Sequence, residues 1–277
     1  MSERPPAPDR LPHPVVDNHC HLEMTLDGTE ELEPGEALAA AAAVGVPRIV
    51  QIGCELDSAR WSVEVAAAHE GIVAGVALHP NEAPRLVAAG TFEETWAELQ
   101  RLAEAPQVRA VGETGLDHYR TGEDGRAAQE ESFRLHVDLA KRLGKTLVIH
   151  DRDAHEEVLR VVDEEGAPER VVMHCFSGDA EFARACLDRG FWLSFAGTVT
   201  FKNAAPLREA LVVAPRDRLL VETDAPFLTP TPYRGRPNAS YLVPLTMRLM
   251  AAERGDDLSD LCRAVEANTF EAFGGRW

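Results

Sequence analysis

The chain has 277 residues, of which 45% are hydrophobic, and it carries a formal net charge of −18 at pH 7. That length suits one large α/β barrel or two ordinary domains, and because no linker divides the chain we expect a single domain over residues 1–277. The negative charge argues against capture of nucleic acid by long-range attraction, and no apolar run is long enough to cross a bilayer, so we expect no membrane association.

The N-terminal segment, residues 1–13, is polar and rich in proline. It lacks the charged start and apolar run of a secretory signal, so we expect a flexible N-terminal extension on a cytoplasmic protein. No stable protein partner is implied by the sequence.

Eight short aliphatic runs then alternate with longer segments rich in alanine, leucine, glutamate and arginine. The predicted strands lie at residues 15–16, 48–52, 72–77, 108–111, 146–149, 171–173, 191–195 and 219–221. The predicted helices lie at 36–44, 58–69, 92–103, 123–143, 154–165, 180–189, 205–213, 241–254 and 258–273. Eight strand and helix repeats predict an α/β fold of the (β/α)8 TIM-barrel type. An open doubly wound sheet is the alternative, but no glycine-rich phosphate loop follows the first strand.

Polar side chains follow the predicted strands, at the rim where a TIM barrel carries its active site. The first strand leads to His19 and His21, and in an extended chain residues i and i+2 project to the same side. The side chains at the other strand ends are His79, Glu113, His150, His174, Glu222 and Asp224. Five of the ten histidines of the chain therefore lie on this rim.

Imidazoles and carboxylates gathered in this way predict a metal centre. The candidate ligands are His19, His21, Glu113, His150, His174 and Asp224. They are too many for a single catalytic zinc, whereas two divalent cations would use them all, with Glu113 able to bridge. Zinc, magnesium, manganese, iron and nickel all remain open as the metal.

The cysteines predict no metal or disulfide chemistry. There are five, an odd number, and no two form a C-x-x-C pair. Cys20 and Cys175 each neighbour a candidate ligand, and period-two alternation sends both thiols toward the helices as packing residues.

The same residues carry a family resemblance that spans nearly the whole chain. Residues 17–22 (DNHCHL) resemble the opening D-x-H-x-H-L motif of the TatD family of metal-dependent hydrolases and deoxyribonucleases, and residues 112–117 (GETGLD) resemble its G-E-x-G-L-D motif. Further similar segments are 150–154 (HDRDA), 174–178 (HCFSG), 200–203 (TFKN), 222–226 (ETDAP) and 268–270 (NTF).

The resemblance implies a TIM-type barrel with a binuclear site. His19, His21 and Asp224 would hold one cation, His150 and His174 would hold the other, and Glu113 would be shared. The chain departs from the family pattern in two places. Asn81 replaces the second histidine of an H-P-H segment, and residues 234–238 (RGRPN) replace R-G-K-x-N, so both changes touch substrate recognition.

These residues predict a divalent-metal-dependent hydrolase that uses an activated water. The resemblance implies that the enzyme is a TatD-type deoxyribonuclease, which cleaves DNA phosphodiesters. The candidate catalytic residues are Asp224, Glu113 and Glu222. Asp224 is the candidate general base, and Glu222 either orients Asp224 or is a buried carboxylate. The candidate substrate contacts are His79, Arg152, Lys202 and Arg236.

The alternatives for these contacts stay open. Arg152 could instead pair with a nearby acid, and Lys202 could simply be solvated. Tyr119 could stack on a base or cap its loop, and the loop role is slightly favoured. Because the charge disfavours capture of duplex DNA, we expect action on single-stranded DNA or strand ends, like a 3'-5' exonuclease.

Two other functions compete with this one. The same metal chemistry could hydrolyse a small amide, ester or lactone, since one barrel supports many substrates. A non-enzymatic metal-binding protein with a degenerate site is disfavoured by the intact ligand set.

Overall fold

The fold is a barrel of eight parallel strands, as the sequence predicts. The computed structural model describes residues 3–26, 29 and 32–277. The strands are hydrogen-bonded in chain order from β1 to β8. Their bounds are β1 Val16–Cys20, β2 Arg48–Gly53, β3 Ile72–Val76, β4 Val108–Asp117, β5 Thr146–Arg152, β6 Val171–Met173, β7 Trp192–Phe195 and β8 Leu219–Val221.

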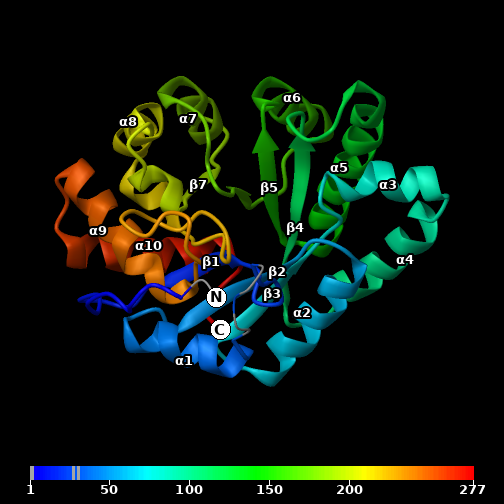
Figure 1. Ribbon diagram of the computed structural model, residues 1–277. Helices are drawn as coiled ribbons and strands as arrows, with labels where there is room; N and C mark the ends of the chain where they lie inside the picture. Colours follow the sequence, from blue (N-terminus) through cyan, green and yellow to red (C-terminus); the bar gives the residue numbers. More distant parts are fainter. Residues whose placement is uncertain (1–2, 27–28, 30–31) are drawn as a thin grey trace.

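Helices surround this sheet (Figure 1). Their bounds are α1 Pro34–Ala43, α2 Leu56–Ala68, α3 Glu82–Ala89, α4 Phe92–Ala103, α5 Glu123–Leu143, α6 His155–Glu165, α7 Ala180–Leu187, α8 Ala205–Val213, α9 Val243–Arg254 and α10 Leu258–Ala272. The sequence predicts all of these except α3. Pro84 lies in the first turn of α3, where a missing N–H costs no helical hydrogen bond, and Gly90 ends the helix with φ of 73°.

The barrel closes where the segment after β8 meets the end of β1. The N–H of Asp224 donates to the carbonyl of His19 at 2.9 Å, and the N–H of His21 donates to the carbonyl of Ala225 at 2.8 Å. This seam fixes the two histidines of the first motif against the segment that carries Asp224.

Strands β4 and β5 extend beyond their predicted ends. The predicted runs stop at residues 111 and 149, whereas the two strands stay paired as far as Asp117 and Arg152 (Figure 1). His150 is therefore paired with Gly115, and Glu113 lies at the register shift between Val111 and Thr114, inside β4 rather than after it. The apolar run alone could not reveal this extension, because the added residues are mostly polar or glycine.

The inner side of the barrel has an apolar layer beneath a layer of ionisable groups. Val148, Val172 and Leu220 belong to a buried cluster that also includes Phe270 and Phe273 of the C-terminal segment. Two residues further along the chain, the next positions on the same side are His150, His174 and Glu222. The alternation along each strand therefore places the polar side chain next to a buried apolar layer.

The N-terminal segment contains no helix or strand over residues 3–13, and it lies against the barrel. Leu11 is buried and its N–H donates to the carbonyl of Val44 at 2.9 Å, while the hydroxyl of Tyr241 donates to the carbonyl of Pro5 at 2.7 Å. Within the described residues, no helix has the length and apolar character that a membrane span requires.

Candidate metal centre

Glu113 lies at the centre of the predicted cluster. Its Oε1 is 2.5 Å from Nδ1 of His150 and 2.8 Å from Nε2 of His174. Its Oε2 is 3.5 Å from Nε2 of His19 and 3.9 Å from Nε2 of His21. One carboxylate therefore faces imidazoles on both sides, with His150 and His174 at one oxygen and His19 and His21 at the other.

Asp224 completes the group from the other side of the barrel seam. Its Oδ1 is 3.4 Å from Nε2 of His21 and 3.9 Å from Nε2 of His19. The structure thus brings together all six of the side chains that the sequence singles out as metal ligands.

The bonding state of the histidines fits a bound cation. His19 is fully buried, and neither ring nitrogen has a hydrogen-bond partner among the described residues. An unpartnered imidazole in an apolar interior is costly, and a cation would supply the missing partner. His21 can donate from Nδ1 to the carbonyl of Ile52 at 3.0 Å, which leaves the Nε2 lone pair directed at the cluster.

Two buried carboxylates orient the imidazoles on the β5 and β6 side. Oε1 of Glu222 is 3.1 Å from Nδ1 of His174, and Oδ2 of Asp117 is 3.4 Å from Nε2 of His150. A carboxylate behind an imidazole fixes the ring and raises its basicity as a ligand. Glu222, for which the sequence leaves two roles open, therefore contacts His174. The role of Asp117 was missed, although the residue lies in the GETGLD motif.

The charges of the cluster set its protonation. Burial opposes ionisation of Glu113, but the neighbouring His174, His79 and His150 outweigh it and hold the pKa of this carboxyl well below its usual range. Burial lowers the pKa of His19, which favours the neutral imidazole that a metal requires.

Asn81 replaces a histidine of the family pattern and joins the cluster through hydrogen bonds. Its Nδ2 donates to Oδ2 of Asp117 at 3.2 Å, and its backbone N–H donates to Nδ1 of His79 at 3.1 Å. The hydroxyl of Thr121 donates to its Oδ1 at 2.9 Å. Asn81 therefore supports two groups that face the cluster.

Cys54 is a further member of the cluster, although the sequence predicts no metal chemistry for the cysteines. Its Sγ donates to Oε2 of Glu113 at 3.4 Å and lies 3.8 Å from Nδ1 of His21. Burial raises the pKa of this thiol to about 12. The signal was available, because Cys54 directly follows β2 and thus occupies the same rim position as the predicted ligands.

Cys20 packs in the core between sheet and helices as expected, whereas Cys175 is half-buried with φ of 43°, outside the strand geometry that the alternation assumed.

The four residues that the sequence predicts as substrate contacts have different surroundings in the structure. His79 faces the cluster, with Nε2 3.6 Å from Oε1 of Glu113. The guanidinium of Arg152 lies 3.9 Å from the ring centre of Tyr119. Lys202 is exposed. Arg236 donates to the carbonyls of Glu3 and Arg4, both at 2.8 Å, so its guanidinium is bound to the N-terminal segment.

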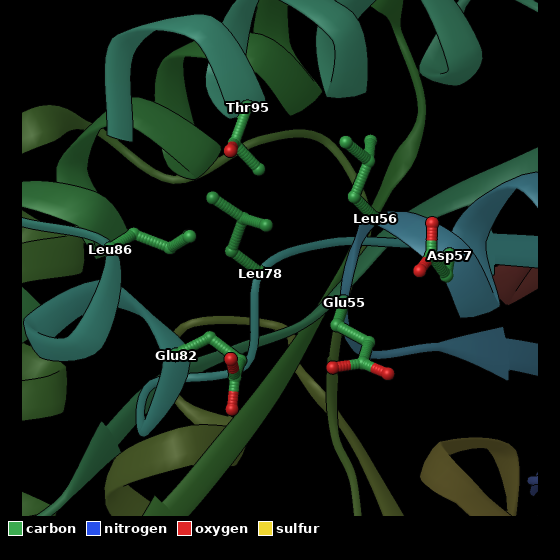
Figure 2. A pocket seen from close by; sticks show the side chains of 7 residues that line it. All are labelled: Glu55, Leu56, Asp57, Leu78, Glu82, Leu86 and Thr95. Carbon is green, nitrogen blue, oxygen red and sulfur yellow. The ribbon is translucent and has the colours of Figure 1, made fainter. Parts of the chain in front are cut away.

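A hollow of about 210 Å³ lies between α2, α3 and α4. Figure 2 shows the carboxylates of Glu55 and Glu82 on one side of it and Leu56, Leu78 and Leu86 on the other. None of the six predicted ligands lines it. Its acidic rim is unsuited to a phosphate.

Comparison with known proteins agrees with this geometry. The family model described as "TatD related DNase" matches residues 16–274. The chain is 44% identical over 268 residues to the "Uncharacterized metal-dependent hydrolase TatD" of Mycobacterium tuberculosis, covering 95% of this chain and 99% of that protein. It is 35% identical to the "Uncharacterized metal-dependent hydrolase YcfH" of Escherichia coli, covering 94% of this chain and 95% of that protein.

Solved structures show the same fold. The TatD homologue YJJV of Escherichia coli superposes with a TM-score of 0.84 at 25% identity, covering 95% of this chain and 98% of that one. A TatD-family hydrolase of Entamoeba histolytica superposes with a TM-score of 0.82 at 18% identity, covering 95% and 99%. With its motif residues gathered on one barrel rim, the chain belongs to the TatD family of metal-dependent hydrolases.

Proposed function

We propose that this protein is a deoxyribonuclease that hydrolyses phosphodiester bonds at the ends of single-stranded DNA and uses two divalent cations. The observation that carries the proposal is the position of Glu113, which faces His150 and His174 with one oxygen and His19 and His21 with the other. A carboxylate between two ligand sets is suited to bridging a pair of cations.

His19, His21 and Asp224 would hold one cation, and His150 and His174 the other, with Glu113 shared. The ligand atoms of His19, His21 and Glu113 all lie within 4.8 Å of one another, a spacing that supports the first of these sites. Divalent cations held there supply Lewis acidity, which lowers the pKa of water and polarises a phosphoryl oxygen. Asp224 would accept the proton that the attacking water loses, because its carboxylate faces the cluster and is partly open to solvent.

His79 and Arg152 would hold the phosphate. Nδ1 of His79 accepts the N–H of Asn81, so the neutral ring carries its proton on Nε2, the atom that faces the cluster. That N–H is a donor suited to an anionic oxygen. Arg152 lies two residues beyond His150 on β5 and therefore on the same side of the strand.

The reaction is tested on the purified protein after removal of metal with EDTA and addition of single divalent ions. The substrates are one oligonucleotide in single- and double-stranded form, labelled at the 5' or the 3' end to give the direction. We expect release of nucleotides from single strands, from the 3' end. Asp224→Asn should lower kcat by at least about 100-fold, the scale of a lost general base. Glu94→Gln, an exposed change on α4, is the matched control.

A protein that binds two equivalents of metal and releases no nucleotide would contradict the proposal. The net charge of −18 favours one other candidate, hydrolysis of a small uncharged amide, ester or lactone, because such a substrate is not repelled. Turnover of compounds of this kind without any cleavage of DNA would select that function.

A further inference from the structure

We propose that Tyr119 and Phe227 are the residues that select unpaired bases, each stacking on a nucleobase at the mouth of the metal centre. This inference rests on the proposed function and assigns the specificity of the same site to two side chains outside the ligand set.

Both rings are exposed where a soluble protein would ordinarily bury them. Tyr119 is 65% exposed and Phe227 is 42% exposed. Among the described residues they are the two aromatic members of the exposed large hydrophobic side chains, which otherwise comprise Val87 and Val212. An exposed aromatic pair on a catalytic face is typical of a binding surface.

Their places in the fold put them on opposite sides of the barrel mouth. Tyr119 lies two residues after β4, and Phe227 lies in the segment after β8. Strands 4 and 8 are half a turn apart in the order of eight, and parallel strands present their carboxyl ends at one rim. Asp224, which follows β8, and Glu113, which lies within β4, belong to the candidate ligand set.

Tyr119 is held with one face covered. The guanidinium carbon of Arg152 lies 3.9 Å from its ring centre, and the remainder of the ring is exposed. The N–H of His118 donates to the carbonyl of Arg152 at 2.9 Å, which ties the loop of Tyr119 to β5. A cation on one face and solvent on the other leave a fixed, open surface for a base.

Phe227 is held by backbone contacts one turn away from Asp224. Its N–H donates to the carbonyl of Asp224 at 2.9 Å. The side-chain amide of Asn238 donates to the carbonyls of Phe227 at 2.6 Å and Thr223 at 2.9 Å. The backbone of Phe227 is therefore tied to that of the residue proposed as the general base.

Base stacking suits this protein because its negative charge does not attract DNA. With a net charge of −18 the protein as a whole repels a phosphate backbone at long range rather than attracting it. Base stacking depends on the π face and works on any base that is unpaired. A duplex keeps its bases stacked on each other, so two such rings would favour single strands.

The test compares KM and kcat on two substrates. One is a single-stranded oligonucleotide, and the other is the same chain with tetrahydrofuran in place of its last bases. Tyr119→Ala and Phe227→Ala should each raise KM on the normal chain by about 10-fold, as loss of one stacked base implies, and leave kcat within about 2-fold. On the base-free chain the wild type should already show the raised KM, and neither variant should add to it.

Matched variants separate stacking from packing. Tyr119→Phe keeps the aromatic face and should behave as the wild type, whereas Phe227→Leu keeps the bulk and should behave as Phe227→Ala. Val212→Ala removes an exposed apolar side chain on α8 and should change nothing. Equal effects on the two substrates, or an unchanged KM on the normal chain, would overturn the inference while leaving the proposed nuclease intact. A wild-type protein that keeps its metals but neither binds nor cleaves DNA would contradict both the stacking inference and the proposed nuclease function.

Discussion

Cys54 contacts the candidate metal ligand Glu113 and is expected to orient it. Its thiol donates to Oε2 of Glu113, the oxygen that faces His19 and His21. Cys54→Ala should lower metal affinity about 10-fold, the usual cost of losing a group that orients a ligand. Cys54→Ser keeps a donor and should lose less. Metal affinity is measured by competition with a chromophoric chelator.

The control for this prediction is Cys262→Ala, a buried cysteine of α10 in the outer core. A Cys54→Ala protein that binds metal as tightly as the control would contradict the orienting role. A Cys54→Ser protein as weak as Cys54→Ala would instead indicate that sulfur itself contacts the ion.

At the scale of residues, the sequence predicts well those side chains that follow strands in an obvious pattern. His19, His21, His150 and His174 stand out because imidazoles are rare in the chain. Cys54 was missed because a cysteine after a strand is also an ordinary core residue. Arg236 illustrates the opposite case, since an arginine in a loop gives no sign that the N-terminal segment will hold it.

At the scale of elements, Gly115 shapes the paired ends of β4 and β5. Its φ is 135°, and a Cβ at this position would overlap the carbonyl oxygen of His150. Gly115→Ala should therefore force the two strands apart, lower the free energy of unfolding by about 3 kcal/mol and reduce kcat, because Glu113 and His150 lie on these strands. Urea unfolding and DNA hydrolysis measure the two effects.

Gly90 offers the matched control for this change. It also has positive φ, 73°, but an added Cβ there would meet no atom within 4 Å. Gly90→Ala should cost about 1 kcal/mol and leave kcat unchanged. If the two substitutions behave alike, the overlap with His150 does not govern the strand ends.

Helix α5 supports the site through a buried histidine. Nδ1 of His136 donates to the carbonyl of Ser132 at 2.7 Å, and its Nε2 accepts the N–H of Leu78, the residue before His79, at 3.0 Å. Burial lowers the pKa of His136 from 6.5 to about 4. The unfolded chain therefore binds more protons than the folded one between these values, and the stabilisation is complete above pH 6.5 and is lost as pH falls toward 4.

The expected size of that loss is about 3 kcal/mol in the free energy of unfolding. His136→Gln keeps one donor and one acceptor but does not titrate, so its free energy of unfolding should fall less over the same pH range. Urea titrations of both proteins from pH 7 to pH 4 measure the difference. Parallel curves would show that His136 does not carry this part of the acid sensitivity.

The elements themselves were largely predictable because buried parallel strands and amphipathic helices have distinct composition. The helices α4, α5 and α8 have the predicted bounds. Helix α3 was not predicted because it is short and carries Pro84 in its first turn. The extensions of β4 and β5 were not predicted because their residues are mostly polar or glycine and gain order from contacts across the chain.

At the scale of the whole molecule, the barrel gathers ionisable side chains from distant segments at one rim. The net charge of −18 is spread over the chain, while six side chains from distant segments meet at one rim. The order of strands was predictable from alternation, but the distances between these groups depend on the seam at Asp224 and on the paired ends of β4 and β5. Those contacts are long-range and leave no local pattern.

The net charge leads to a prediction about salt. A basic nucleic-acid-binding protein loses affinity steeply as salt rises, because counterions compete for the phosphates. This protein instead repels DNA at long range, and raising KCl from about 20 to about 150 mM shortens the screening length to about 8 Å. At a fixed concentration of divalent metal, kcat/KM on single-stranded DNA should therefore stay constant or rise by about 2-fold. A dinucleotide, with a single phosphate to repel, should show almost no change. A fall of about 10-fold for the long substrate would mean that a cationic surface, rather than the metals and the stacked bases, holds the DNA.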